Sequence, residues 1–182
     1  MLTNKGQKGV TLVELLITLV VTAILTAFAV PSLRSYIQET RIATLSNDFV
    51  AIVHDTRSEA ATRGAPVVIC ATQDGFRCSG SWDDGWMSYL DLNNNGTRDI
   101  GNMKPRDLCD PVTQECVVRR VYAPAGGALL ANVASHASLG FMPTGFLTGG
   151  AETFELCVAG VATGRQITIL ASGQVNITGL EC

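Results

Sequence analysis

The sequence predicts an α+β fold, in which one long N-terminal helix precedes an antiparallel β-sheet domain. Residues 10–33 form an apolar run whose one ionisable side chain is Glu14. Residues 34–63 change to a helical pattern with one apolar face. From Pro66 onward, β-branched residues and frequent glycines indicate short strands separated by turns. The economical arrangement is a sheet packed on the C-terminal half of the helix.

The apolar run of residues 10–33 is long enough to cross a bilayer as a helix, since roughly 20 apolar residues suffice. A secretory signal has its cleavage site after the apolar core, whereas here Gly9 comes before it and cleavage would leave the run on the mature protein. Removing residues 1–9 would remove Lys5 and Lys8, two of the 13 basic side chains, and none of the 16 acidic ones. This acidic balance argues against a general nucleic-acid binder.

The position of Glu14 in the apolar run predicts a charged partner for its carboxylate. An isolated carboxylate in hydrocarbon costs about 2.5 kcal/mol or more. The expected partner is the amino group that cleavage would create at Val10, on the same or a neighbouring subunit. The alternative is a plain membrane anchor with an acid at the interface. Farther along, Pro31 removes one backbone hydrogen bond and predicts a kink in the helix.

Residues 34–64 are expected to form the amphipathic half of the long helix. Apolar residues recur there in steps of three and four, at Ile42, Leu45, Phe49, Ile52, Val53 and Ala60. Gly64 and Pro66 predict the end of the helix. The sheet domain then takes residues 65–182, with strands expected at 67–71, 86–92, 117–122, 129–133, 138–142, 154–159, 166–170 and 174–178.

The six cysteines lie beyond residue 69. An even number outside a membrane anchor suggests disulfides and an oxidising compartment. Sequence alone allows many pairings, but local spacing favours Cys70 with Cys78 and Cys109 with Cys116. Cys157 would then pair with Cys182. The alternative is a zinc site, for which the sequence offers no CxxC pair and only histidines that are far from the cysteines.

One stretch has the spacing of a calcium loop. Asp91, Asn93, Asn95 and Asp99 would offer oxygen ligands around a glycine turn, as in the first part of an EF-hand loop. That loop has a glutamate at its twelfth position, where this sequence has Asn102, and no helices flank it. The alternative is a hairpin turn rich in asparagine and glycine. No other metal and no cofactor is predicted.

The remaining polar residues do not predict an enzyme. His54 and His136 lie in helix and loop contexts, without an evident nucleophile constellation. Trp82 and Trp86 are expected to pack over the helix or beside the Cys70 loop, with partners for their indole N–H groups.

The block Gly9-Val10-Thr11-Leu12-Val13-Glu14 resembles the leader junction of type IV prepilins and pseudopilins. In that family a membrane peptidase cuts after the glycine and methylates the new amino terminus, which here would be Val10. The family's glutamate is the fifth mature residue, as Glu14 would be, and Pro31 falls where the family places a helix proline. The family more often has phenylalanine where this chain has Val10. The resemblance implies a prepilin with the pilin fold.

Later blocks resemble the GspH/FimT group of minor pilins and pseudopilins, which includes FimU-like proteins. They are Arg57-Ser58-Glu59-Ala60, Pro66-Val67-Val68-Ile69-Cys70, Phe141-Met142-Pro143-Thr144-Gly145 and Thr153-Phe154-Glu155-Leu156-Cys157. The resemblance implies a minor pilin of a type IV pilus, in a tip complex that primes assembly. Implied partners are other major and minor pilins, the prepilin peptidase, the inner-membrane assembly platform and, before assembly, inner-membrane lipid. The implied location is the bacterial inner membrane, with a single pass and a periplasmic C-terminal domain, and then the pilus at the cell surface.

Two alternatives remain within this resemblance. Some members of the group bind DNA for natural transformation through a glycine-arginine-x-arginine turn, and residues 173–176 read Gly-Gln-Val-Asn instead. Phosphate binding needs positive charge, so Arg119, Arg120 and Arg165 would have to form the patch, unless they are solvated strand ends. The second alternative is a GspH-like pseudopilin of a type II secretion system, which has the same leader and a similar sheet.

Overall fold

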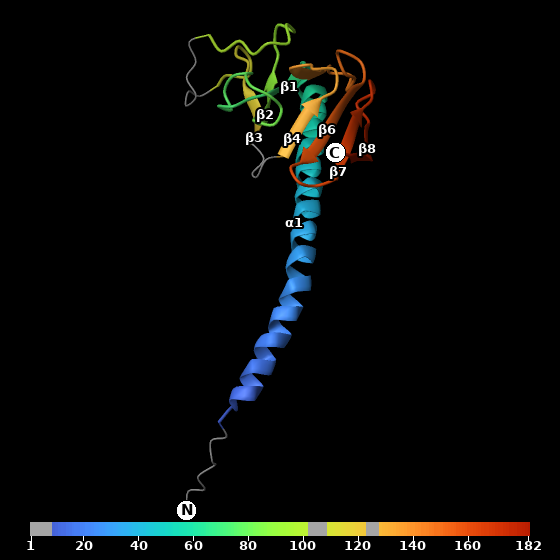
Figure 1. Ribbon diagram of the computed structural model, residues 1–182. Coiled ribbons are helices and arrows are strands. Elements are labelled where there is room, and N and C mark those ends of the chain that lie inside the picture. Colours follow the sequence, from blue (N-terminus) through green and yellow to red (C-terminus); the bar gives the residue numbers. More distant parts are fainter. Residues whose placement is uncertain (1–8, 102–108, 123–127) are drawn as a thin grey trace, which may run out of the picture. The chain divides into compact units, whose positions relative to one another are not determined.

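The computed structural model describes residues 9–101, 109–122 and 128–182. It consists of a helix followed by strands (Figure 1): α1 (Leu12–Arg63), β1 (Val67–Ala71), β2 (Gly85–Leu90), β3 (Val117–Tyr122), β4 (Ala128–Asn132), β5 (Ser138–Phe141), β6 (Glu152–Val158), β7 (Thr163–Ile169) and β8 (Val175–Glu181). The leader up to Lys8 and Asn102 of the predicted calcium loop lie outside the described residues. The chain divides into two compact units, Met1–Glu39 and Thr40–Cys182.

Both ends of α1 have local capping residues. Thr11 precedes the helix, and its Oγ1 accepts a hydrogen bond from the backbone N–H of Glu14, 3.3 Å away. This bond satisfies one of the N–H groups that the first turn leaves without a helical partner. At the other end Gly64 has a φ of 64°, in the left-handed region that favours glycine. The helix assignment continues through Pro31, and the predicted kink there stays a prediction.

The first unit holds an apolar helical stretch. Leu12–Val30 has a mean hydropathy of 2.4, is not buried by other parts of the chain, and is long enough to cross a membrane. Thr18, Thr22 and Thr26 interrupt its apolar surface, and each hydroxyl donates to a backbone oxygen of the preceding turn, at 2.7 to 2.9 Å. These bonds satisfy the three hydroxyl donors without a partner from outside the helix.

In the second unit the strands form two antiparallel sheets. The first has the order β3-β2-β1-β5 and the second β4-β6-β7-β8. The predicted strands agree with the observed ones apart from a few residues at their ends, and the antiparallel sheet domain is confirmed. The division into two sheets was not predicted. It separates β4 from β5, although the two are neighbours in sequence, because β5 pairs with the distant β1.

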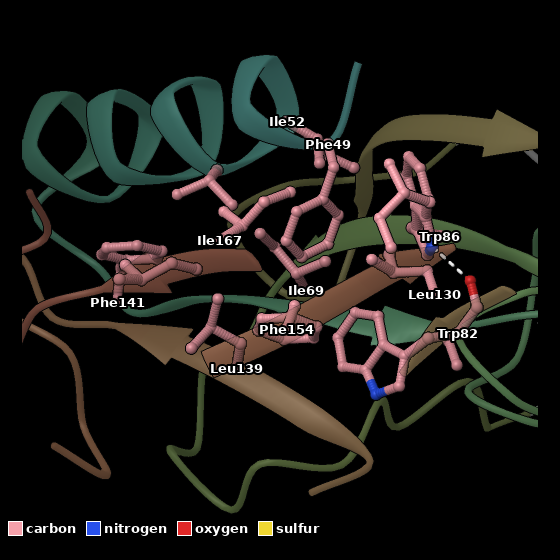
Figure 2. Packing of buried hydrophobic residues seen from close by; sticks show 14 of the residues in the cluster. Phe49, Ile52, Ile69, Trp82, Trp86, Leu130, Leu139, Phe141, Phe154 and Ile167 are labelled. Carbon is pink, nitrogen blue, oxygen red and sulfur yellow. Dashed lines mark hydrogen bonds between the residues drawn. The ribbon is translucent and has the colours of Figure 1, made fainter. Parts of the chain in front are cut away.

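The core lies where residues 40–63 of α1 meet both sheets. Phe49 is fully buried and its ring contacts Trp82, Trp86 and Phe154, with centroid distances of 6.0, 5.1 and 4.6 Å. Figure 2 shows this aromatic cluster below the helix. The indole N–H of Trp86 donates to the backbone oxygen of Trp82, and that of Trp82 to the backbone oxygen of His136. Both tryptophans therefore pack as the sequence predicts.

Three disulfides hold the second unit together. They join Cys70 to Cys78, Cys109 to Cys116 and Cys157 to Cys182. The first two are the pairs that local spacing favours, and the third is the pair that then remains. All six cysteines are used, and none is free for a zinc site.

Candidate functional site

The predicted cleavage site lies in non-helical, accessible chain. Gly9 and Val10 both precede α1, and Val10 is 72% exposed. An ideal Cβ at Gly9 would meet no atom within 4 Å. The Gly9–Val10 bond is therefore accessible without unwinding of the helix.

Glu14 lies in the first turn of α1, three residues after the capping Thr11. A carboxylate is favourable at this end of a helix because the unpaired N–H groups carry partial positive charge. Its side chain is exposed in the single chain. Cleavage after Gly9 would place a positive amino terminus at Val10, one helical turn before Glu14. The arrangement therefore supplies a negative group and a potential positive group at the start of an apolar helix.

The predicted calcium residues come together in the connection between β2 and β3. Asp91 is 1% exposed, and its two carboxylate oxygens accept hydrogen bonds from the backbone N–H groups of Asn95 (3.1 Å) and Gly96 (2.8 Å). The side-chain amides of Asn93 and Asn95 both donate to the same oxygen of Asp99, at 2.6 and 3.0 Å. The residues at this spacing therefore form a compact polar loop. No three His, Cys, Asp or Glu side chains within residues 9–101, 109–122 and 128–182 are arranged to hold a metal ion.

The loop also contacts residues that the sequence analysis did not select. Glu115, just before β3, accepts a hydrogen bond from the backbone N–H of Asp99. Arg98 is buried and donates to the backbone oxygens of Glu115 and Phe76. No local pattern marks Glu115, because it is 16 residues from Asp99 and reaches it only through the pairing of β2 with β3.

The three arginines considered for DNA binding lie on different surfaces. Arg119 and Arg120 are neighbours on β3 and therefore point to opposite faces of that strand. Arg119 forms an ion pair with Asp55 of α1. Arg165 is on β7, and Figure 1 shows β3 and β7 on opposite sides of α1. The fold does not gather these side chains into one patch.

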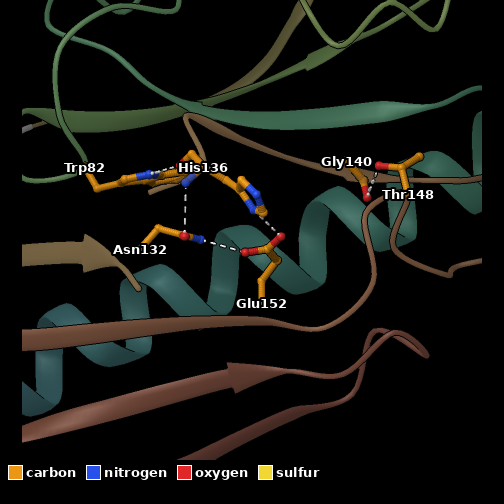
Figure 3. A network of polar contacts seen from close by, with 6 residues as sticks. All are labelled: Trp82, Asn132, His136, Gly140, Thr148 and Glu152. Atoms are coloured by element: carbon orange, nitrogen blue, oxygen red, sulfur yellow. Dashed lines mark hydrogen bonds and ion pairs between the residues drawn. The ribbon is translucent and has the colours of Figure 1, made fainter. Parts of the chain in front are cut away.

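A buried carboxylate organises a polar network that the sequence analysis also missed. Glu152 is 5% exposed, accepts a hydrogen bond from the Asn132 amide (2.8 Å) and pairs with His136 Nδ1 (2.7 Å). Figure 3 shows how these side chains fix the segment after β4 beside Trp82. His136 and Glu152 line a hollow of about 680 Å³, which Asp91 and Asn95 also line. The network positions loops and uses each polar group of Glu152.

Comparison with known proteins agrees with this architecture of an apolar N-terminal helix joined to antiparallel sheets. Residues 4–30 match the sequence model of the prokaryotic N-terminal methylation motif. Residues 45–173 match that of the family described as type II transport protein GspH. Because this match covers more than half of the chain, the protein belongs to the GspH family. No curated protein sequence matches the chain significantly.

Two similar solved structures are crystal forms of one protein, the type IV minor pilin FimU of Pseudomonas aeruginosa strain PAO1. The form in space group P21 has a TM-score of 0.55 and 18% sequence identity, and the alignment covers 79% of this chain and 92% of that one. The form in space group P65 has a TM-score of 0.50, also at 18% identity, and covers 75% and 91%. The likeness confirms the pilin fold.

Proposed function

We propose that this chain is a minor pilin of a type IV pilus, with a structural and not an enzymatic role. A prepilin peptidase cleaves it after Gly9 and methylates Val10. Residues 10–33 first anchor it in inner-membrane lipid, with residues 65–182 in the periplasm, and then enter the helical core of the filament. The single observation that carries the proposal is an exposed Gly9–Val10 junction directly before the apolar, uncovered helix Leu12–Val30, in a chain with a GspH-family domain.

Glu14 gives the proposal its mechanism. In the filament core, the carboxylate pairs with the amino terminus of a neighbouring subunit, because a charge left unpaired among apolar helices is costly. The pair therefore selects one register of subunit against subunit. The sheet domain docks on other major and minor pilins, and the assembly platform in the inner membrane supplies the subunits. A position in a tip complex that primes assembly follows from the resemblance to the FimU-like group.

The deciding experiment counts the filaments that can be sheared from cells that lack this protein. We expect a large loss of filaments, restored by the wild-type chain and not by a chain whose Gly9 is replaced to prevent cleavage. Mass spectrometry of the restored protein should find a methylated Val10 as its first residue. Unchanged piliation in the deletion strain would refute the priming role, and an intact leader in assembled filaments would refute the processing step.

A second candidate is a pseudopilin of a type II secretion system, favoured by the description of the matching family. A pseudopilin would be processed and anchored in the membrane in the same way as a minor pilin. The two candidates therefore differ only in the assembly that the chain joins, a secretion system or a pilus. Loss of a secreted enzyme from the culture medium, with piliation unchanged, would identify this candidate. DNA binding is less favoured, because Gln174 and Asn176 replace the arginines of the binding turn and the fold separates Arg119 from Arg165.

A further inference from the structure

The connection between β2 and β3 contains a polar cluster that the proposed function does not use. Its two ends lie side by side, because β2 pairs with β3. Asp91 follows the end of β2, and Glu115 precedes the start of β3. Both side chains are buried, at 1% and 4% exposure. Buried carboxylates are rare unless a hydrogen bond or a cation compensates the cost of removing the charge from water.

Asp91 has such compensation and Glu115 has only part of it. The two oxygens of Asp91 accept the N–H groups of Asn95 and Gly96. One oxygen of Glu115, Oε2, accepts the N–H of Asp99, but the buried Oε1 has no hydrogen-bond partner. The carboxylate of Glu115 therefore contacts the backbone of the loop at Asp99 and keeps one buried oxygen unsatisfied.

A second buried oxygen, on the neighbouring strand β2, is also unsatisfied. The hydroxyl of Tyr89, on β2, is fully buried and has no hydrogen-bond partner. Tyr89 is two residues before Asp91 in the chain. Buried polar atoms without partners are exceptional in native proteins and point to a missing water or ion.

The charge of the cluster selects the kind of ligand. Residues 91–99 and Glu115 contain three carboxylates and one guanidinium, that of Arg98. Burial and the nearby charge of Arg120 lower the pKa of Arg98, so Arg120 is a second positive group beside the cluster and one negative charge remains in excess. A divalent cation balances this excess of negative charge. Oxygen ligands without thiols or imidazoles are typical of calcium and not of zinc or copper.

The outer part of the loop provides further oxygens and an open approach. Asn93, Asn95 and Asp99 are exposed, and both asparagine amides point at one oxygen of Asp99. A cation would replace these two N–H donors as the positive partner of Asp99. The amide oxygen of each asparagine accepts one backbone N–H, from residue 95 or 97. An amide oxygen has two lone pairs, so each keeps one for a metal.

We propose that residues 91–99 bind one calcium ion through Asp91, Asn93, Asn95 and Asp99, with Glu115 as the buried carboxylate that closes the site. Glu115 takes the role of the glutamate that a calcium loop usually carries at its twelfth position, from the opposite end of the connection. Since three carboxylates are not already arranged around one point, the site depends on the asparagine oxygens and on a shift of Asp99 toward the ion.

Calorimetric titration of the full chain with calcium chloride tests the proposal. The protein is kept in detergent micelles with its disulfides intact, and is first stripped with a chelator. We expect one ion per chain and a dissociation constant of about 10⁻⁴ to 10⁻³ M, the range of extracellular calcium modules. Magnesium chloride should bind more weakly, because the smaller ion requires a stricter octahedral geometry. Calcium should also raise the melting temperature of the wild-type protein.

Glu115→Gln and Asp99→Asn should each weaken binding by about tenfold or more, because each removes one of the charged ligands. The matched control is Glu181→Gln, an exposed glutamate at the end of β8, which should bind like the wild type. A folded, oxidised wild-type chain without saturable binding would overturn the proposal. So would wild-type affinity in either loop variant. If Glu115→Gln does not fold, the calcium affinity of Asp99→Asn, which changes an exposed side chain, still tests the proposal. The proposed pilin function would survive either failure, because the leader and the apolar helix take no part in this site.

Discussion

The side chain of Arg57, near the end of α1, donates a hydrogen bond from Nε to the backbone oxygen of Gly145, 3.1 Å away. Its Nη1 also donates to the backbone oxygen of Gly173, at 3.5 Å. Gly145 follows β5 of the first sheet, and Gly173 lies in the turn between β7 and β8 of the second. A Cβ at Gly173 would lie 2.9 Å from Arg57 Nε, so glycine allows this close approach. One helical side chain thus fixes loops of both sheets.

Arg57→Ala should lower the free energy of unfolding by about 1.5 to 3 kcal/mol, because it removes charged hydrogen bonds to partly buried carbonyl groups. The matched control is Arg63→Ala on the same helix. Arg63 forms an exposed pair with Glu59, and such pairs contribute about 0.2 to 1 kcal/mol. Urea unfolding of the oxidised protein measures both values. Equal losses in the two variants would show that Arg57 does not fix the loops.

Gly164→Ala should disturb the disulfide between Cys157 and Cys182. A Cβ at this position in β7 would lie 2.4 Å from Cys182 Sγ and 2.4 Å from the backbone oxygen of Leu156. The strand must shift, which we expect to cost about 1 to 3 kcal/mol, as for overpacked cores. Gly179→Ala is the control, because its Cβ would meet nothing within 4 Å. Thermal melts of both oxidised variants test this, and an undisturbed Gly164→Ala would contradict it.

The ionised carboxylate of Asp84 should stabilise the folded state, so its protonation in acid should contribute to unfolding. Its carboxylate accepts hydrogen bonds from the Ser81 N–H and the Gln73 amide, which lower the pKa of Asp84. A lowered pKa in the folded state means that the ionised form favours folding. This contribution is complete above about pH 4, near the unfolded pKa, and is lost as the pH falls through the folded pKa. Melting temperatures between about pH 5 and 2 should therefore fall less steeply for Asp84→Asn than for wild type. The neighbouring Asp83→Asn serves as the control, and identical slopes for wild type and Asp84→Asn would reject the assignment.

Glu14→Ala should insert in the membrane normally and fail to enter filaments. Without the carboxylate, the neighbouring amino terminus would stay unpaired among apolar helices, at a cost of about 2.5 kcal/mol or more. Immunoblots of membrane and sheared-filament fractions measure the two steps. Glu39→Ala, an exposed acid on the same helix, should reach the filament fraction at the wild-type level. Normal amounts of Glu14→Ala in that fraction would contradict the pairing mechanism.

Local features of this fold were predictable from the sequence because they depend on neighbouring residues. The apolar run, the glycine after Arg63 and the β-branched strands predict the elements within a few residues. The disulfides Cys70–Cys78 and Cys109–Cys116 close short loops, so spacing alone indicates them. Once these pairs are assigned, Cys157 and Cys182 remain for the third.

Contacts between distant segments were not predictable in this way. The division into two sheets depends on β1 pairing with β5, which lies about seventy residues later in the chain. Arg57 reaches carbonyl groups 88 and 116 residues away. Glu115 joins the loop of residues 91–99 only because β2 and β3 pair. In the candidate calcium site, therefore, the sequence indicates the loop but not its buried carboxylate.

The disulfides have a mechanical consequence for a subunit under tension. All three join residues of the sheets and their loops, and α1 contains no cysteine. A pulling force along the helix is therefore carried to the sheets by the buried side chains of the helix, such as Phe49, by the polar contacts of Arg57 and Asp55, and by the chain segment that follows the helix at Gly64. Under increasing load the helix should slide out of the aromatic cluster first. The cystine-closed segments would keep their length until covalent bonds break, which limits how far the subunit can stretch.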